Sequence, residues 1–225
     1  MGQAIGEFLP AALGVAISPL PIVAVVLMLV TPRGRVNGPL FVLGWLVGLA
    51  LVGVLVLSIS NGADATGSSG PATWVDWLFL VLGLGLIGLA FKGWQGRPRE
   101  GEEPATPKWM GALDHFTPVK SAGAGTVLSA LNPKNLLLAV AAGAAIADAG
   151  VSTGHEIASY VVFALIASLG VATPLAVYFV MGERSTEILQ RMKTWLGHNN
   201  AVIMAVLLLV IGVKLVGNAI SGFSG

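Results

Sequence analysis

The stretch Ala130-Leu131-Asn132-Pro133-Lys134-Asn135 sets a proline, a lysine and two asparagines inside a long apolar run. Ala16-Ile17-Ser18-Pro19-Leu20-Pro21, near the N-terminus, likewise has a small polar residue before a proline in such a run. A proline inside a helix removes a backbone hydrogen bond and clashes with the preceding turn. In hydrocarbon the freed carbonyl groups need partners, so such breaks persist only where protein or water covers them. We therefore expect two broken helices around a polar site.

The composition around these stretches is that of an integral membrane protein. Of the 225 residues, 55% are hydrophobic and only 10% are charged, and the mean hydropathy is +0.85. Soluble domains carry about 25% charged residues, whereas a membrane crossing needs about 20 apolar residues. The sequence therefore predicts an all-α integral membrane protein with about six transmembrane helices. The apolar runs cover residues 3–30, 37–60, 74–95, 120–147, 156–181 and 199–220.

The cations fall on alternate connections between these runs. Ten of the twelve Lys and Arg residues lie in or beside the first, third and fifth connections, and the second and fourth hold none. The positive-inside rule makes those three connections cytoplasmic. We expect a multi-pass protein of the inner (plasma) membrane with both termini outside. The ten cations are Arg33, Arg35, Lys92, Arg97, Arg99, Lys108, Lys120, Arg184, Arg191 and Lys193.

A weak internal repeat divides the chain into two halves. Besides the two proline stretches, residues 86–93 resemble residues 210–217, and the matches keep the same order in both halves. An odd number of spans per repeat gives the halves opposite orientations, as in many secondary transporters. We predict a first three-helix repeat at 1–95, a cytoplasmic linker at 96–119 and a second three-helix repeat at 120–225. Chance similarity between apolar segments is the alternative.

Two cytoplasmic segments have the spacing of amphipathic helices. One ends the linker, and the other covers residues 183–198. We expect both to lie in the membrane interface with tryptophan anchors, and helical linkers packed on the protein are the alternative. The apolar residues are Trp109, Met110, Leu113 and Phe116 in the first, and Ile188, Leu189, Met192, Trp195 and Leu196 in the second.

Polar residues at the two breaks form the candidate substrate-binding site. A helix broken near the midplane exposes backbone groups and half-helix ends that carry partial charge. Serine and asparagine side chains add donors and acceptors at the same level. The alternative is that the prolines only kink the helices for packing. The predicted substrate-binding residues are Ser18, Pro19, Pro21, Asn132, Pro133, Lys134, Asn135 and Lys214.

The two remaining cations, Lys134 and Lys214, lie within apolar segments. A charge deep in a membrane is expensive and by default marks a functional site. We expect Lys134 to attract an anionic group such as phosphate, sulfate or carboxylate, or else to bond the backbone of the broken helix. Lys214 lies close enough to its helix end to extend its amine to the interface; lining a transport path is the other possibility.

Signals for other classes of protein are missing from the sequence. The chain has no cysteine, which removes disulfides and thiolate metal sites. The three histidines lack metal-ligand spacing, and no nucleophile–base arrangement or phosphate-binding loop is present. We therefore expect no enzymatic activity, no cofactor, no metal and no nucleic-acid partner. The 30 glycines, Gly44 and Gly48 among them, indicate close helix packing.

Three motifs resemble the GAP family of peptidoglycolipid- and sulfolipid-addressing proteins, within the LysE superfamily of small membrane exporters. They are residues 14–21, residues 31–35 (Thr-Pro-Arg-Gly-Arg) and residues 131–135. The resemblance covers nearly the whole chain, and its motifs are moderately specific because similar proline motifs recur across the superfamily. It implies six helices and a role in moving complex lipids or glycolipids toward the cell surface. It leaves the substrate open, because neighbouring families export amino acids or metal ions.

Carried over to this chain, the resemblance places Ser18, Pro19, Pro21, Asn132, Pro133, Lys134 and Asn135 at the motif positions. We expect an exporter or flippase of an anionic lipid or glycolipid, which predicts a lateral opening between helices. An exporter of a small solute such as an amino acid would instead need an enclosed polar cavity. An accessory scaffold of a larger lipid-export machinery would have a packed midplane. The glycine-rich faces suggest a homodimer.

The length of the first and fourth segments qualifies the six-span prediction. Each has about 30 residues, or about 45 Å as a straight helix, against a hydrocarbon core of about 30 Å. We therefore expect each of these segments to be a bent span or a re-entrant hairpin.

Overall fold

A computed structural model of the chain describes residues 2–64, 73–96 and 116–224. Every regular element in these ranges is a helix, so the prediction of an all-α membrane protein is confirmed. The predicted linker residues Trp109, Met110 and Leu113 lie outside the described residues. The helices are α1 (Gly2–Ala16), α2 (Pro19–Leu29), α3 (Gly34–Asp64), α4 (Thr73–Gln95), α5 (Pro118–Ala130), α6 (Pro133–Asp148), α7 (Thr153–Met181), the short 3-10 helix η2 (Gly182–Arg184) and α8 (Ser185–Ser224).

Four single helices are long and apolar enough to cross a membrane, and two further candidates are bent pairs. The α1–α2 pair bends by 40° and the α5–α6 pair by 61°. If each pair is one span, the described residues contain up to six spans. The expected breaks in the first and fourth segments are thus present. The single candidates are Gly34–Ser60, Asp76–Gln95, Thr153–Met181 and Ala201–Phe223.

Prolines set the position of both bends. Pro19 and Pro133 are each the first residue of the second helix of their pair, the position where a missing N–H group costs least. The Ser18 N–H group bonds the Val15 carbonyl three residues back. The preceding Gly14 carbonyl is therefore not used by Ser18.

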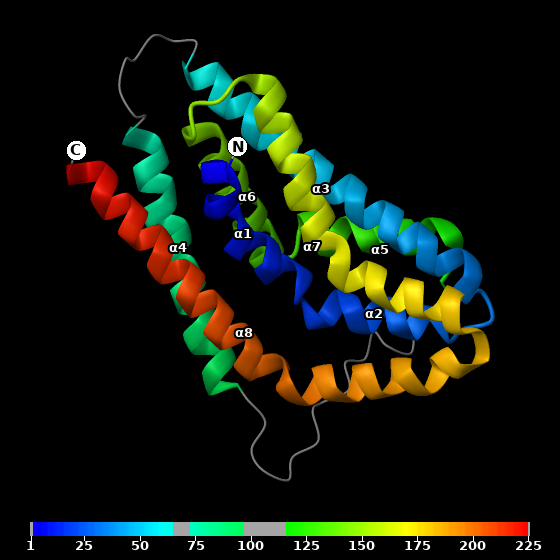
Figure 1. The fold of residues 1–225 in the computed structure, drawn as a ribbon. Coiled ribbons are helices and arrows are strands. Elements are labelled where there is room, and N and C mark those ends of the chain that lie inside the picture. The colour runs from blue at the N-terminus through cyan, green and yellow to red at the C-terminus, as the bar shows by residue number, and fades with distance from the viewer. Residues whose placement is uncertain (1, 65–72, 97–115, 225) are drawn as a thin grey trace.

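One helix of each broken pair lies inside the bundle. Figure 1 shows α1 and α6 at its centre, with α4 and α8 side by side along one edge. Phe8, Ala12 and Val15 of α1 are fully buried, as are Leu138 and Ile146 of α6. Protein therefore covers the backbone at the α1–α2 break, as the cost of exposing it to lipid requires, whereas Leu131 and Pro133 at the α5–α6 break are exposed.

Glycines bring α3 and α5 into close contact. A Cβ atom on Gly44 would fall on the Ala122 carbonyl, and one on Gly125 would fall on the Phe41 carbonyl. Thr126 Oγ1 also donates to the Gly44 carbonyl at 2.9 Å. Contact of this kind between backbones needs small residues at the interface, so the predicted role of Gly44 in packing is confirmed.

The segment predicted as a separate amphipathic helix at 183–198 is instead mostly the first part of α8. In Figure 1 this part runs across the bundle beneath α2 and then bends into the span beside α4. Leu189 is fully buried and Met192 packs against the core. Trp195 is 58% exposed, which suits a side chain at a membrane interface.

Candidate functional site

At the α1–α2 break, the Ser18 hydroxyl caps no helical N–H group and bonds distant partners instead. A serine before a helix usually accepts a hydrogen bond from the N–H group of the second or third helical residue. Here the third residue is Pro21, which has no N–H group. Ser18 makes no capping bond, although its backbone is extended as a cap requires.

At the α5–α6 break, capping occupies the equivalent side chain. Asn132 Oδ1 accepts from the Lys134 N–H group at 3.2 Å. The third residue of α6 is Asn135 rather than a proline, and its side chain is fully buried. Asn132 therefore stabilises its own helix end, while Lys134 and Asn135 extend their side chains across the bundle.

These side chains form one continuous chain of hydrogen bonds, which we call the polar chain. Lys134 Nζ donates to the Gly14 carbonyl at 2.8 Å and to Ser18 Oγ at 2.9 Å. Ser18 Oγ lies 3.2 Å from Asn135 Oδ1, to which it donates. Asn135 Nδ2 then donates to the Leu128 carbonyl at 2.9 Å.

The two ends of the polar chain occupy matching positions in the two halves. Gly14 lies four residues before Ser18, and Leu128 lies four residues before Asn132. Each supplies a backbone carbonyl next to a proline break. Both carbonyls are satisfied by consecutive side chains of α6, from Lys134 and Asn135. The second half therefore supplies the polar groups for both breaks.

The polar chain contains the amine of Lys134, which has no carboxylate partner among the described side chains. Ser18 is 4% exposed, and Lys134 is half-buried. The third contact of Lys134 Nζ is the thioether sulfur of Met204, at 3.4 Å. The N-terminal ends of α2 and α6, which carry partial positive charge, are joined by the bonds of Ser18 with Lys134 and Asn135. This arrangement favours an anionic group.

An apolar groove of about 340 Å³ opens beside the α1–α2 break. We call it the α1/α7 groove, because these helices form its walls together with the start of α2 and the first part of α8. Ile17, in the turn just after α1, lines the groove and directly precedes Ser18 of the polar chain. The groove therefore adjoins the candidate site. Its lining includes Leu13, Ile17, Ile22, Leu169, Thr173 and Trp195.

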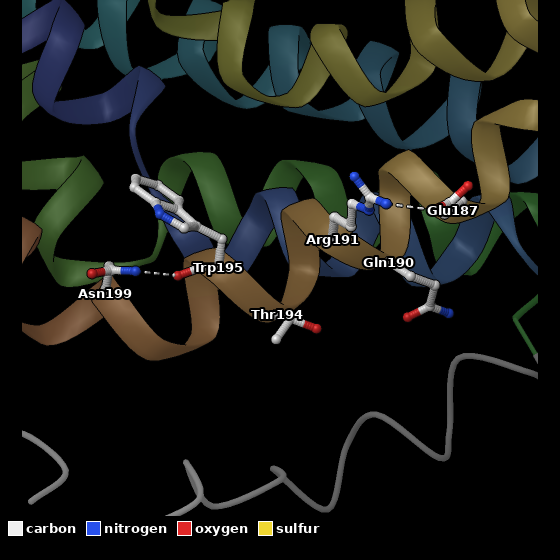
Figure 2. Close-up of a pocket in the computed structure, with 6 residues that line it drawn as sticks. All are labelled: Glu187, Gln190, Arg191, Thr194, Trp195 and Asn199. Atoms are coloured by element: carbon white, nitrogen blue, oxygen red, sulfur yellow. Dashed lines mark hydrogen bonds and ion pairs between the residues drawn. The ribbon is translucent and has the colours of Figure 1, made fainter. Parts of the chain in front are cut away.

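A second hollow, of about 610 Å³, lies on the outer face of the first part of α8 (Figure 2). Arg191 pairs there with Glu187 at 2.6 Å, and Asn199 Nδ2 donates to the Trp195 carbonyl at 2.9 Å. All its lining residues belong to this one helix, and none belongs to the polar chain. Its larger volume therefore does not make it the better candidate.

Most predicted site residues lie at the breaks, but Lys214 does not join them. Pro19 and Pro21 are buried at the start of α2, whereas Pro133 is exposed. Lys214 Nζ lies 3.4 Å from the Gly6 carbonyl, in the first turns of α1. Gly6 precedes Ser18 by more than three helical turns, so Lys214 is well separated from the polar chain.

Sequence reasoning missed the contributions of Gly14, Leu128 and Met204. Gly14 and Leu128 act through backbone carbonyls, which every residue has, so residue type gives no signal. Met204 is an apolar residue in an apolar run. Only the three-dimensional positions of Lys134 Nζ and Asn135 Nδ2 identify these partners.

Comparison with known protein families identifies the family of this chain. Residues 8–221 match the model of the family described as Sap, sulfolipid-1-addressing protein. Neither a curated protein nor a solved structure matches the chain. The match includes both breaks and confirms the resemblance to the sulfolipid-addressing GAP family, whereas the wider LysE superfamily stays a prediction. The chain therefore belongs to the Sap, sulfolipid-1-addressing protein family.

Proposed function

We propose that the chain is a transporter that exports or flips an anionic lipid or glycolipid toward the cell surface. Membership of a sulfolipid-addressing family suggests lipid export or addressing. The observation that carries the proposal is the Lys134 ammonium group, whose contacts in the described residues are all neutral. A cation within a membrane protein is costly unless it is compensated, and an anionic headgroup would supply that compensation.

Met204 gives such a headgroup a way to reach Lys134. An ammonium group has three hydrogen-bond donors, and a thioether sulfur is only a weak acceptor. The contacts with Gly14 and Ser18 are shorter and are made to oxygen. An anionic oxygen that replaces the Met204 sulfur would gain a charge-assisted hydrogen bond. Lys134 could therefore bind the headgroup without releasing either break.

The shape of the site supports a lipid over a small water-soluble solute. A solute exporter needs an enclosed polar cavity, whereas a lipid carrier needs an opening toward the bilayer. The α1/α7 groove beside the polar chain is open and almost entirely apolar. This groove would let the apolar part of a lipid stay near the bilayer while its headgroup reaches Lys134.

The helix contacts support movement of two inverted halves as the transport step. In the predicted repeat, helices α1 to α4 correspond in order to α5 to α8. Exchanging the halves turns the α3–α5 contact into the α7–α1 contact and the α2–α8 contact into the α6–α4 contact, and all four contacts are present. The largest departure from this exchange is that α1 packs on α6, whereas among the described residues α2 and α5 make no comparable contact. In our proposal the transporter alternates between this arrangement and one in which α2 and α5 approach each other.

An accessory scaffold of a larger lipid-export machinery is the second candidate function. Its supporting observation is that every polar group of the polar chain has a partner. A scaffold of this kind would move no lipid alone.

Lipid flipping in proteoliposomes tests the proposal. The purified protein should move a fluorescent anionic lipid, such as a sulfated glycolipid, faster than protein-free vesicles, and faster than a zwitterionic lipid with the same tails. Lys134→Ala should lower this rate at least about tenfold, because losing one charge-assisted hydrogen bond costs about 1.5–3 kcal/mol. Lys120→Ala, at an exposed lysine of α5, should leave the rate unchanged.

Each other outcome has a definite meaning. Unchanged flipping by Lys134→Ala would remove Lys134 from the mechanism. A wild-type protein that moves no lipid alone would favour the scaffold, and uptake of an amino acid instead would favour the solute exporter.

A further inference from the structure

The α1/α7 groove offers very little polar surface to a polar ligand. Thr173 is its main polar lining residue, and its hydroxyl donates to the Leu169 carbonyl of the same helix at 2.7 Å. Leu13, Ile17 and Ile22 contribute only hydrocarbon. Sugars or charged headgroups would lose their hydration in this groove without compensation. The groove is therefore suited to a hydrocarbon ligand.

The inner wall of the groove is fixed where α7 crosses the α1–α2 break. A Cβ atom on Gly170 would fall on the Ala16 carbonyl and lie 3.2 Å from Ile22 Cδ1. The absence of a side chain at Gly170 lets α7 come this close to the break. The groove thus lies directly against the kink that also positions Ser18. A ligand in the groove and a ligand at the polar chain would be neighbours.

The first part of α8 limits what can occupy the groove. Met192 and Trp195, both from this part, line the groove on one side, and Figure 1 shows this part running across the bundle beneath α2. A transmembrane helix of another chain is about 10 Å wide, so it would need more room than the groove's 340 Å³. This volume lies at the lower end of the usual range for small-ligand sites.

From this geometry we propose that the α1/α7 groove binds one acyl chain of a membrane lipid, with the headgroup of that lipid at Lys134. The exposed indole of Trp195 borders the groove, as expected at the level of lipid headgroups. The step from Ile17, in the groove, to Ser18, in the polar chain, joins the apolar and polar parts of this site. The inference rests on the proposed function and names where the tail binds.

Photolabelling tests this assignment without requiring transport. The full-length protein is reconstituted with an anionic lipid that carries a diazirine at the end of one acyl chain, illuminated and digested. We expect adducts on the peptides that contain residues 13–22 and residues 169–173. Thr173→Trp should fill the groove and lose most of this labelling. Val161→Trp, at an exposed position of the same helix outside the groove, should retain it.

A second variant keeps the test valid if Thr173→Trp fails to fold. Leu13→Trp fills the groove from the opposite wall, and Leu13 is 44% exposed. Labelling of the wild-type protein elsewhere, or undiminished labelling of a folded groove-filling variant, would overturn the inference. If the groove is not labelled but Lys134-dependent flipping persists, the groove inference fails and the proposed function stands. If the groove is labelled but no lipid is flipped, the proposed function fails and the groove site stands.

Discussion

The ammonium group of Lys134 lies 2.8 Å from the carbonyl oxygen of Gly14, which is 120 residues earlier in the chain. This bond joins the break in the second half to the break in the first. The Gly14 carbonyl is not used by Ser18, whose N–H group bonds Val15 instead. An unpaired carbonyl inside a membrane protein costs free energy. The α1–α2 kink is therefore stabilised by a residue of the other half, and changes at this contact should affect both structure and transport.

Met204 should control access of an anion to Lys134. Met204→Glu would place a carboxylate near the ammonium group, where the sulfur now lies at 3.4 Å, and would occupy the position that we propose for the headgroup. We expect this variant to lose flipping of anionic lipids. Met204→Leu removes the weak acceptor at similar volume and should flip at least as fast as wild type. Equal rates for the glutamate variant and wild type would contradict the proposal that a headgroup oxygen replaces the Met204 sulfur at Lys134.

Asn135 should stabilise the fold more than a surface asparagine does. Asn135→Ala removes the side-chain donor to the Leu128 carbonyl and the acceptor for the Ser18 hydroxyl proton, and neither group regains that bond from water in the interior. We expect a loss of about 1–3 kcal/mol in the free energy of unfolding, measured by thermal or denaturant unfolding in detergent. Asn199→Ala, near the surface of α8, should change it by less than about 0.5 kcal/mol. Equal losses would show that the polar chain adds no stability.

Two glycines of α5 should respond differently to the same substitution. A Cβ atom at Gly125 would fall on the Phe41 carbonyl and lie 2.8 Å from the Trp45 nitrogen, whereas one at Gly123 would meet nothing within 4 Å. Gly125→Ala should therefore lower the free energy of unfolding by about 1–3 kcal/mol. Gly123→Ala should leave it nearly unchanged, because its added methyl group meets no neighbour. The measurement is unfolding in detergent, and similar values for both variants would mean that α3 and α5 separate easily.

The orientation in the membrane can be read by labelling single cysteines, because the natural chain has none. Thr153→Cys lies at the start of α7, next to a connection without Lys or Arg, and Thr186→Cys lies at the start of α8, beside Arg184. From the positive-inside rule, an impermeant maleimide should label the first in intact cells and the second only after permeabilisation. The reverse pattern would place the termini inside and overturn the predicted topology.

Particular residues show how far sequence reasoning reached. Pro19 and Pro133 located both bends, because a proline removes a backbone hydrogen bond and clashes with the preceding turn, although other prolines lie inside α1, α3 and α7 without ending them. Lys134 was identified because a charge in an apolar run is rare and costly. Lys214 carries the same signal, yet the structure places it near Gly6 rather than at the breaks. Periodicity also failed to show that residues 185–198 continue into the last span, because an interfacial helix and a spanning helix have the same backbone pattern.

The sequence by itself determined that the chain is helical and built for a membrane, that two segments break at prolines, and that one lysine lies at a break. These features follow from composition and from local backbone chemistry. Only the tertiary structure decided that Lys134 and Asn135 satisfy the breaks of both halves, that Met204 is the weak third partner and that an apolar groove adjoins Ser18. The reason is that carbonyl groups and groove walls are supplied by any residue, so only their positions in space make them a site.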